Sequence, residues 1–249
     1  MKFAIITGAS KGLGTSITKR MIEEQIGVIT VSRTENEEMK ALATSSNLFY
    51  QHVPCDLSNI EQIEEAFTKI VELLATENPE EVFVYNNAGM VEPIETVGKL
   101  PTERVVTNVQ LNLLAPMIIS NLFLERASSS KLTIVNITSG AAERPIQGWS
   151  TYCSTKAALN MFTKTAALEQ QTAGSEHVII AYSPGIMDTE MQGVIRSSSQ
   201  ESFQDVEKFK DYKEQGLLRD TDTVANALID LLLANKAESG VVYNVNDLL

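Results

Sequence analysis

The fold is decided near the start of the chain, where residues 3–14 read FAIITGASKGLG. The apolar run at residues 3–6 has the composition of a short buried strand, and the glycines after it permit a tight turn. A helical pattern follows directly, so helix N–H groups and the positive dipole end point toward a site for pyrophosphate. No Gly-Lys-Ser/Thr triplet closes a Walker-type loop, but a plain glycine-rich turn remains an alternative. The predicted contacts are Gly8, Ser10, Lys11, Gly12, Leu13 and Gly14.

The rest of the chain repeats this alternation of strand and helix. Expected strands occupy residues 3–7, 27–32, 48–54, 81–86, 131–138, 177–183 and 241–245. Expected helices occupy residues 12–25, 59–75, 102–125, 150–171 and 222–234, with a weaker one at 35–44. The strands are too apolar to alternate cleanly, as expected when helices cover both faces of a parallel sheet. The pattern predicts an α/β fold, a doubly wound parallel sheet of about seven strands of the Rossmann type.

Domain organisation follows from the absence of a linker. No Pro/Gly/Ser-rich segment separates a second unit, so residues 1–249 are expected to form a single domain. Residues 190–219 break the rhythm, being polar and serine-rich and then charged. An irregular insertion of this length that follows a strand end is typical of a functional loop. We expect residues 190–219 to form a lid over a substrate.

The composition excludes several classes of protein. Of the 249 residues, 43% are hydrophobic and 21% charged, which is typical of a globular chain. A formal net charge of −12 argues against nucleic acid or an anionic membrane as a partner. No uninterrupted apolar run approaches the ~18 residues of a membrane-spanning helix, and the apolar body at residues 3–6 is too short for a signal peptide.

The cysteines and histidines are few. Cys55 and Cys153 cannot form a disulfide framework, which favours a reducing compartment and predicts a cytoplasmic protein. His52 and His177 are too scattered for a metal site, so no metal is expected.

Three residues predict a site for acid catalysis. Ser139 ends the fifth expected strand, at the sheet edge where open α/β folds bind ligands. Tyr152 and Lys156 are four residues apart on an expected helix and therefore project from one face. A lysine cation beside a phenol stabilises phenolate, which predicts a Tyr152 pKa below the reference value of ~10 and a usable proton donor. An ordinary helix pair is the alternative for Tyr152 and Lys156 taken alone.

The end of the second expected strand indicates the cofactor. An acidic residue there would bind the ribose 2′-OH of NAD, whereas arginine accommodates the 2′-phosphate of NADP. This chain has Arg33 at that position, and Lys11 in the glycine-rich turn adds a second positive charge. The sequence therefore favours NADP(H) over NAD(H).

The spacing TGxxxGxG of residues 7–14, with Ser139, Tyr152 and Lys156, resembles the short-chain dehydrogenase/reductase family along nearly the whole chain. The resemblance implies an NADPH-dependent reductase that transfers a hydride to a ketone. In that family the equivalent of Ser139 polarises the substrate carbonyl and that of Tyr152 protonates it. The equivalent of Lys156 holds the nicotinamide ribose and lowers the pKa of the tyrosine.

The same resemblance assigns further residues. It implies that Asn112 carries a proton-relay water, with Asn108 as a nearby competitor, and that subunits pair through the helices containing Asn112 and Tyr152, giving a dimer or tetramer. It also implies cofactor contacts at the adenine end, beside the fourth strand and at the nicotinamide end, from Asp56, Leu57, Asn87, Ala88, Gly89, Pro184, Gly185, Ile186 and Thr189.

Several segments are similar to the branch of this family that contains sepiapterin reductases and bacterial enzymes that reduce benzil to (S)-benzoin. Sepiapterin reductases carry an Asp near the C-terminus that binds the pterin, where this chain has Asn244. An apolar pocket wall is expected from Ile146, Trp149, Met187 and Met191. The resemblance, Asn244 and these apolar residues together favour an aromatic 1,2-diketone as the expected substrate. Pterin ketone reduction, 3-oxoacyl carrier reduction and a non-enzymatic NADP sensor remain alternatives.

Overall fold

The computed structural model describes residues 1–126 and 130–249, and its seven strands form one parallel sheet in the order β3-β2-β1-β4-β5-β6-β7. Each strand lies within two residues of the expected range, so the predicted doubly wound sheet is confirmed. The order reverses between β1 and β4, which is where such folds bind ligands. The strands are β1 (Lys2–Thr7), β2 (Gly27–Ser32), β3 (Tyr50–Pro54), β4 (Glu81–Asn86), β5 (Lys131–Ile137), β6 (Val178–Ser183) and β7 (Val242–Asn244).

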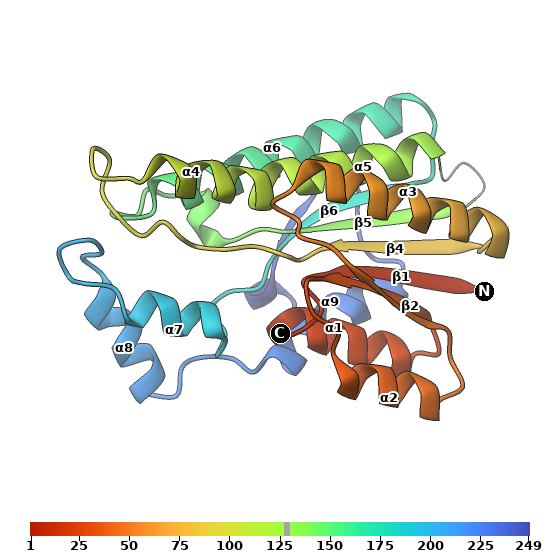
Figure 1. Ribbon diagram of the computed structural model, residues 1–249, viewed down its shortest axis with the longest axis horizontal. Coiled ribbons are helices and arrows are strands. Elements are labelled where there is room, and N and C mark those ends of the chain that lie inside the picture. The colour runs from red at the N-terminus through yellow and green to blue at the C-terminus, as the bar shows by residue number, and fades with distance from the viewer. Residues whose placement is uncertain (127–129) are drawn as a thin grey trace.

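Helices cover both faces of the sheet (Figure 1). Strand side chains alternate between two cores, so Ile5 packs in one and Ile6 in the other, both fully buried. One face carries α1 (Gly12–Glu23), α2 (Glu37–Ser45) and α9 (Thr221–Leu233). The other carries α3 (Ile60–Glu77), α5 (Ala115–Arg126) and α6 (Ser150–Thr172), with α4 (Thr102–Val109) leading into α5.

The helix expected at residues 102–125 is helical throughout but not uniformly α-helical. A π-helical turn, η1 (Gln110–Leu114), separates α4 from α5. Pro116 explains the change, because it has no N–H to donate to the carbonyl of Asn112 four residues earlier and its ring would clash with that carbonyl. Such single-turn widenings occur often at functional sites.

The stretch Thr102–Arg126 is also long and apolar enough to cross a membrane, by length and composition alone. Core helices can meet the same criteria, because an apolar helix in a folded protein is buried against its neighbours. Ile119 and Phe123 on this stretch are 1% and 0% exposed and pack in the core shared with α3. One face of the stretch therefore packs in the core.

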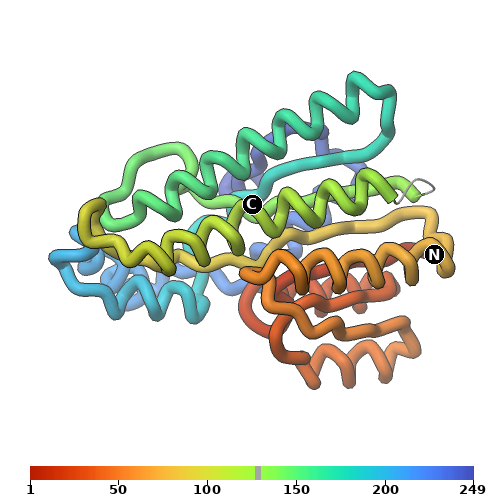
Figure 2. Tube along the Cα trace, turned by 45° about the horizontal axis from the view of Figure 1, so that its top comes forward, coloured from red at the N-terminus to blue at the C-terminus, as the bar shows by residue number. Residues whose placement is uncertain are grey.

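The structure corrects the prediction that residues 190–219 are irregular. The segment forms α7 (Glu190–Arg196) and α8 (Val206–Glu214), which lie beyond the carboxyl ends of the strands (Figure 1). Phe203 and Val206 are 0% and 1% exposed, so a few apolar residues order an otherwise charged segment. Figure 2 shows α7 and α8 again outside the sheet, near the chain around residue 100, where Lys99 forms an ion pair with Glu201 at 2.6 Å.

Candidate active site

The glycine-rich turn after β1 is closed by the turn after β4. Gly8 has φ +66°, and a Cβ on Gly14 would lie 2.3 Å from the Gly8 carbonyl oxygen, so both positions require glycine. The amide Nδ2 of Asn87 donates to the carbonyls of Thr7 at 2.9 Å and Gly8 at 3.3 Å. The Thr7 hydroxyl accepts from the backbone N–H of Ala88 at 3.0 Å. These bonds fix the turn before any ligand binds.

The N-terminus of α1 suits a bound anion. Its N-cap residue Lys11 makes no side-chain capping bond, and the first turn contains no acidic residue. The helices α2, α3 and α9 differ, because Asn36, Asn59 and Asp220 cap them. The free N–H groups and helix dipole of α1 are therefore available to a phosphate group. The residues present fit a dinucleotide.

The predicted contacts near the adenine end lie around this turn. Arg33 is exposed directly after β2, and it contributes to a lowered pKa of Asp56, whose main cause is hydrogen bonding from Ser58. Leu57 is buried next to Asp56. The ammonium of Lys11 forms an ion pair with Glu190 at the start of α7, so its charge is already engaged.

Asn36 is a residue of this region that the sequence analysis missed. Its Nδ2 donates to the carbonyl of Ser10 and to the hydroxyl of Thr15, both at 3.3 Å, while its Oδ1 caps α2. The side chain thus joins the loop after β2 to the glycine-rich turn. An Asn followed by the acidic residues Glu37 and Glu38 is a helix-start signal, which could have identified it and moved the expected start from residue 35 to residue 37.

Predicted contacts at the nicotinamide end follow β6. Gly185 has φ +71°, and Ile186 pairs through its backbone carbonyl with the N–H of Arg219 at 3.1 Å. A Cβ on Gly12 would lie 3.5 Å from Cγ2 of Thr189, so the glycine-rich turn and this segment face one another. Pro184 stands between β6 and this turn.

The predicted acid Tyr152 is buried at the start of α6. Its side chain is 7% exposed, and Ser139 lies beside it as the N-cap of the 3₁₀ turn η2 (Gly140–Ala142). Burial raises the pKa of Tyr152 above its ordinary value, and a hydrogen bond with the Ser139 side chain offsets part of that rise. The prediction that the pKa of Tyr152 is lowered is therefore wrong for the free protein, because loss of solvation is the largest effect on this phenol.

Lys156 lies in the same buried group. Its Nζ donates to the carbonyl of Ile137 at 2.8 Å and is 5.8 Å from the centre of the Tyr152 ring. Burial lowers the pKa of Lys156 from 10.5 to about 8. A Cβ on Gly89 would lie 3.6 Å from this Nζ, so a side chain there would crowd the ammonium.

Asn108 and Asn112 are both fully buried on the α4–η1 helix and differ in their surroundings. Asn112 accepts from the N–H of Met90 at 2.9 Å, and its Oδ1 is 3.1 Å from where a Cβ on Gly89 would lie, beside Lys156. Asn108 donates to the carbonyl of Glu92 at 2.6 Å, farther along the same loop. Both side chains also donate to the carbonyl of Met90, and it is Asn112 that borders Gly89 together with Lys156.

Thr155 is a second residue that the sequence analysis missed. Its hydroxyl is 3.2 Å from Oδ1 of Asn108 and 3.5 Å from Nδ2 of Asn112, and it also lies 3.0 Å from the carbonyl of Tyr152. It therefore connects the helix that carries Tyr152 to the π-helical turn. Only its position three residues after Tyr152 could have suggested it.

The predicted substrate residues fall into two groups. Ile146, Trp149 and Met191 gather with Tyr152 in one apolar cluster at the carboxyl edge. The structure does not bring Met187 and Asn244 into it. Met187 packs with the core under α1 and α9, because its backbone pairs with Arg219. Asn244 lies on the edge strand β7, and its side chain accepts from Asn246, capping the 3₁₀ turn η3 (Val245–Asp247).

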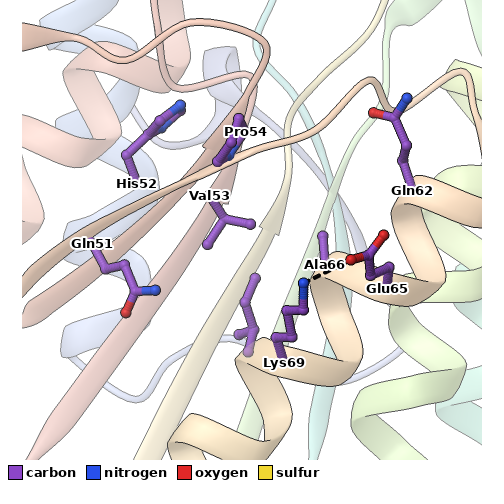
Figure 3. Close-up of a pocket in the computed structure, with 9 residues that line it drawn as sticks. Gln51, His52, Val53, Pro54, Gln62, Glu65, Ala66 and Lys69 are labelled. Carbon is purple, nitrogen blue, oxygen red and sulfur yellow. Dashed lines mark hydrogen bonds and ion pairs between the residues drawn. The ribbon is translucent and has the colours of Figure 1, made fainter.

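A separate hollow of about 370 Å³ lies between β3 and α3 (Figure 3). Gln51, His52, Val53 and Pro54 line it from β3, and an ion pair between Glu65 and Lys69 borders it on α3. None of the predicted catalytic residues lines it. Within residues 1–126 and 130–249, no three His, Cys, Asp or Glu side chains are grouped so as to hold a metal ion.

The burial of Lys156 predicts how stability changes with pH. The unfolded lysine keeps its proton between pH 8 and 10.5, where the folded one has lost it, so stability rises with pH in this window. Relative to Lys156→Met, wild type should gain on the order of 2 kcal/mol in unfolding free energy from pH 7 to 9.5. Urea unfolding of both proteins measures this. The exposed Lys69→Met is the control, and parallel pH curves for wild type and Lys156→Met would contradict the expectation.

This fold and this group of buried residues define an oxidoreductase, and comparison with known proteins agrees. The chain matches the family described as short chain dehydrogenase over residues 2–200, and it belongs to that family, whose members use a nicotinamide cofactor.

Its similarity to particular proteins extends over the full chain. Benzil reductase ((S)-benzoin forming) of Bacillus subtilis (strain 168) is 41% identical over 251 residues, covering 100% of both chains. Sepiapterin reductase of Bos taurus is 28% identical, over 98% of this chain and 94% of that protein. The crystal structure of the KRED1-Pglu enzyme superposes with a TM-score of 0.84 at 27% identity, covering 98% of this chain and 100% of that one.

Proposed function

We propose that the protein is an NADPH-dependent carbonyl reductase that reduces one carbonyl of an aromatic 1,2-diketone such as benzil to give (S)-benzoin. The observation that carries the proposal is the group of Ser139, Tyr152 and buried Lys156 at the sheet edge that also carries the uncapped N-terminus of α1. Full-length similarity to a benzil reductase supports the substrate class.

The chain's own residues supply everything except the hydride, which a bound nicotinamide provides. The Ser139 hydroxyl donates a hydrogen bond to the substrate carbonyl oxygen and fixes its position. Tyr152 gives its proton to that oxygen, so the ketone becomes an alcohol. Lys156 stabilises the phenolate left on Tyr152, because a cation in a buried site interacts strongly with a nearby negative charge. Asn112 orients the water through which Tyr152 recovers its proton.

The specificity for NADPH rests on Arg33. We expect Arg33→Asp to lower the ratio of kcat/KM with NADPH to that with NADH more than tenfold, about 1.4 kcal/mol, because a repelling charge replaces the partner of the 2′-phosphate. Lys11→Ala should act in the same direction but less, since Glu190 already engages Lys11. Initial rates with both cofactors measure the ratio, and Arg126→Asp on α5 controls for net charge. A wild-type preference for NADH would refute the assignment.

The reaction is tested by NADPH oxidation with benzil, sepiapterin and a 3-oxoacyl thioester, followed by chiral chromatography of the benzoin. We expect the highest kcat/KM with benzil and one enantiomer in excess. A higher kcat/KM with sepiapterin would favour the pterin alternative, and one with the thioester would favour the carrier reductase. NADPH binding without turnover of any carbonyl would leave the sensor alternative.

We further propose that the domain acts as a homo-oligomer in the cytoplasm. Met161 and Leu168 on α6 are 64% and 62% exposed, and Val106 on α4 is 48% exposed. Apolar side chains are thus exposed on the helices through which the family resemblance implies that two subunits pair. Cys55 and Cys153 are both free cysteines, which is compatible with a reducing compartment. Light scattering measures the subunit number.

A further inference from the structure

The chain between α7 and α8 closes against the loop that precedes Tyr152. Gly148 in that loop has φ +83°, and a Cβ added to it would lie 2.2 Å from the carbonyl oxygen of Ser202. The Gln147 side chain donates to the carbonyl of Ser202 at 3.4 Å and accepts from the N–H of Gln204 at 2.6 Å. Two segments more than 50 residues apart are thus held in backbone contact.

A chain of aromatic contacts extends from this junction to the site. Phe203 is fully buried and stacks on Trp149, with ring centres 5.0 Å apart and planes 6° from parallel. Trp149 and Tyr152 meet in a T-shaped arrangement, with ring centres 5.6 Å apart and planes at 81°. Phe209 on α8 packs against both Trp149 and Phe203, at 5.4 and 5.3 Å.

The orientation of Trp149 depends on this packing. Its indole N–H is buried and has no hydrogen-bond partner among the residues that the structure describes. The plane of the indole is therefore not fixed by a hydrogen bond. It is fixed by the face of Phe203, on which the indole stacks. The plane of Trp149 in turn limits where the Tyr152 ring can lie, because the two rings are in contact.

We infer that Phe203 is a positioning residue that acts through Trp149 to hold the Tyr152 hydroxyl in place for proton transfer. The inference rests on the proposed role of Tyr152 as the proton donor. The chain between α7 and α8, which contains Phe203, then helps to hold the catalytic side chain in place, in addition to covering the substrate. Small displacements of a reacting group lower rates strongly, so a conformationally loose Tyr152 should be a poor acid.

The test is Phe203→Leu, which keeps apolar volume and removes the flat face. We expect kcat with benzil to fall at least about tenfold with little change in KM or in NADPH affinity. The matched control is Phe67→Leu, because Phe67 is also fully buried and meets Phe123 edge-on at 6.2 Å, in the core under α3. It should lower Tm and leave kcat unchanged. A Phe203→Leu variant that loses only Tm in the same way overturns the inference.

A double-variant cycle separates positioning of Tyr152 from independent effects. If Phe203 acts through Tyr152, adding Phe203→Leu to Tyr152→Phe should not lower kcat further. If the two losses multiply, Phe203 acts elsewhere and the inference fails. Near-normal turnover by Tyr152→Phe alone would instead refute the proton donor in the proposed function.

Gln147→Ala keeps the test decisive if Phe203→Leu does not fold. Gln147 is exposed, so its truncation should leave the core intact. It should also release the chain at Ser202 and Gln204, which the Gln147 side chain holds. We expect kcat to fall about threefold, the effect of one lost hydrogen-bonding side chain, again with no further loss in a Tyr152→Phe background. Unchanged kcat in Gln147→Ala with the same Tm would count against the positioning role.

Discussion

Tyr152→Phe is expected to lower kcat for benzil reduction by at least 100-fold while NADPH binds normally. The ring of Tyr152 packs against Trp149, and phenylalanine preserves that contact, so only the hydroxyl is lost. Proton donation by a positioned side chain is worth roughly 10²–10⁴-fold in rate, which sets the size of the loss. Steady-state kinetics with NADPH titration by fluorescence measures both quantities.

Tyr243→Phe is the matched control for this variant. It also removes one phenolic hydroxyl, whose oxygen accepts from the N–H of Glu238 at 2.8 Å at an exposed position. Its kcat should equal that of wild type. Near-normal turnover by a folded Tyr152→Phe would refute the assignment of the acid, although the oxidoreductase family would stand.

The raised pKa of Tyr152 has a consequence for the pH dependence of reduction. A phenol whose pKa lies above 10 in the free protein stays protonated through neutral pH. Reduction consumes that proton, and the Lys156 cation stabilises the phenolate that remains, so activity should persist through neutral pH and fall as Lys156 loses its proton near pH 8. The pKa of Tyr152 depends on its burial, which no spacing of residues in the sequence reveals.

The sheet, and the grouping of Ser139, Tyr152 and Lys156 at its edge, were predictable because each has a local signal. The strands are apolar runs of the correct length, and the glycines of the first turn stand at required positions such as Gly14. The approach of Ser139 to Tyr152 follows from topology, since Ser139 follows the carboxyl end of β5 and Tyr152 lies at the start of α6, the next long helix of the chain, at the same sheet edge. These features depend on few long-range contacts beyond the sheet itself.

The features that were missed depend on contacts between distant segments. Phe203 and Phe209 stand in a stretch whose polar and charged residues made it look irregular, and their packing on Trp149 makes them part of a core. The π-helical turn at Asn112 coincides with two features, Pro116 in the next turn and a hydrogen bond from the N–H of Met90 to the side chain of Asn112. Met187 was assigned to the substrate wall from its position after Gly185, but it packs against the core under α1 because its backbone pairs with Arg219.

Gly14→Ala is expected to weaken NADPH binding at least 100-fold and to lower Tm. An alanine Cβ would lie 2.3 Å from the carbonyl oxygen of Gly8 and 2.6 Å from Nδ2 of Asn87. The Gly8 oxygen belongs to the backbone and cannot rotate aside as a side chain could. Overpacking of this kind costs about 1–3 kcal/mol, which corresponds to several degrees in Tm for a chain of this size.

The loss of affinity in Gly14→Ala should exceed the loss of stability because the clash acts on the anion site itself. Relieving it moves Gly8 away from Asn87 and tilts the first turn of α1, so its N–H groups no longer converge on the pyrophosphate. Isothermal titration with NADPH and thermal unfolding measure the two effects separately. Gly193→Ala on α7 is the matched control, since nothing lies within 4 Å of the added methyl and alanine favours the helix. If Gly14→Ala binds NADPH as tightly as Gly193→Ala does, the glycine-rich turn is not the pyrophosphate site.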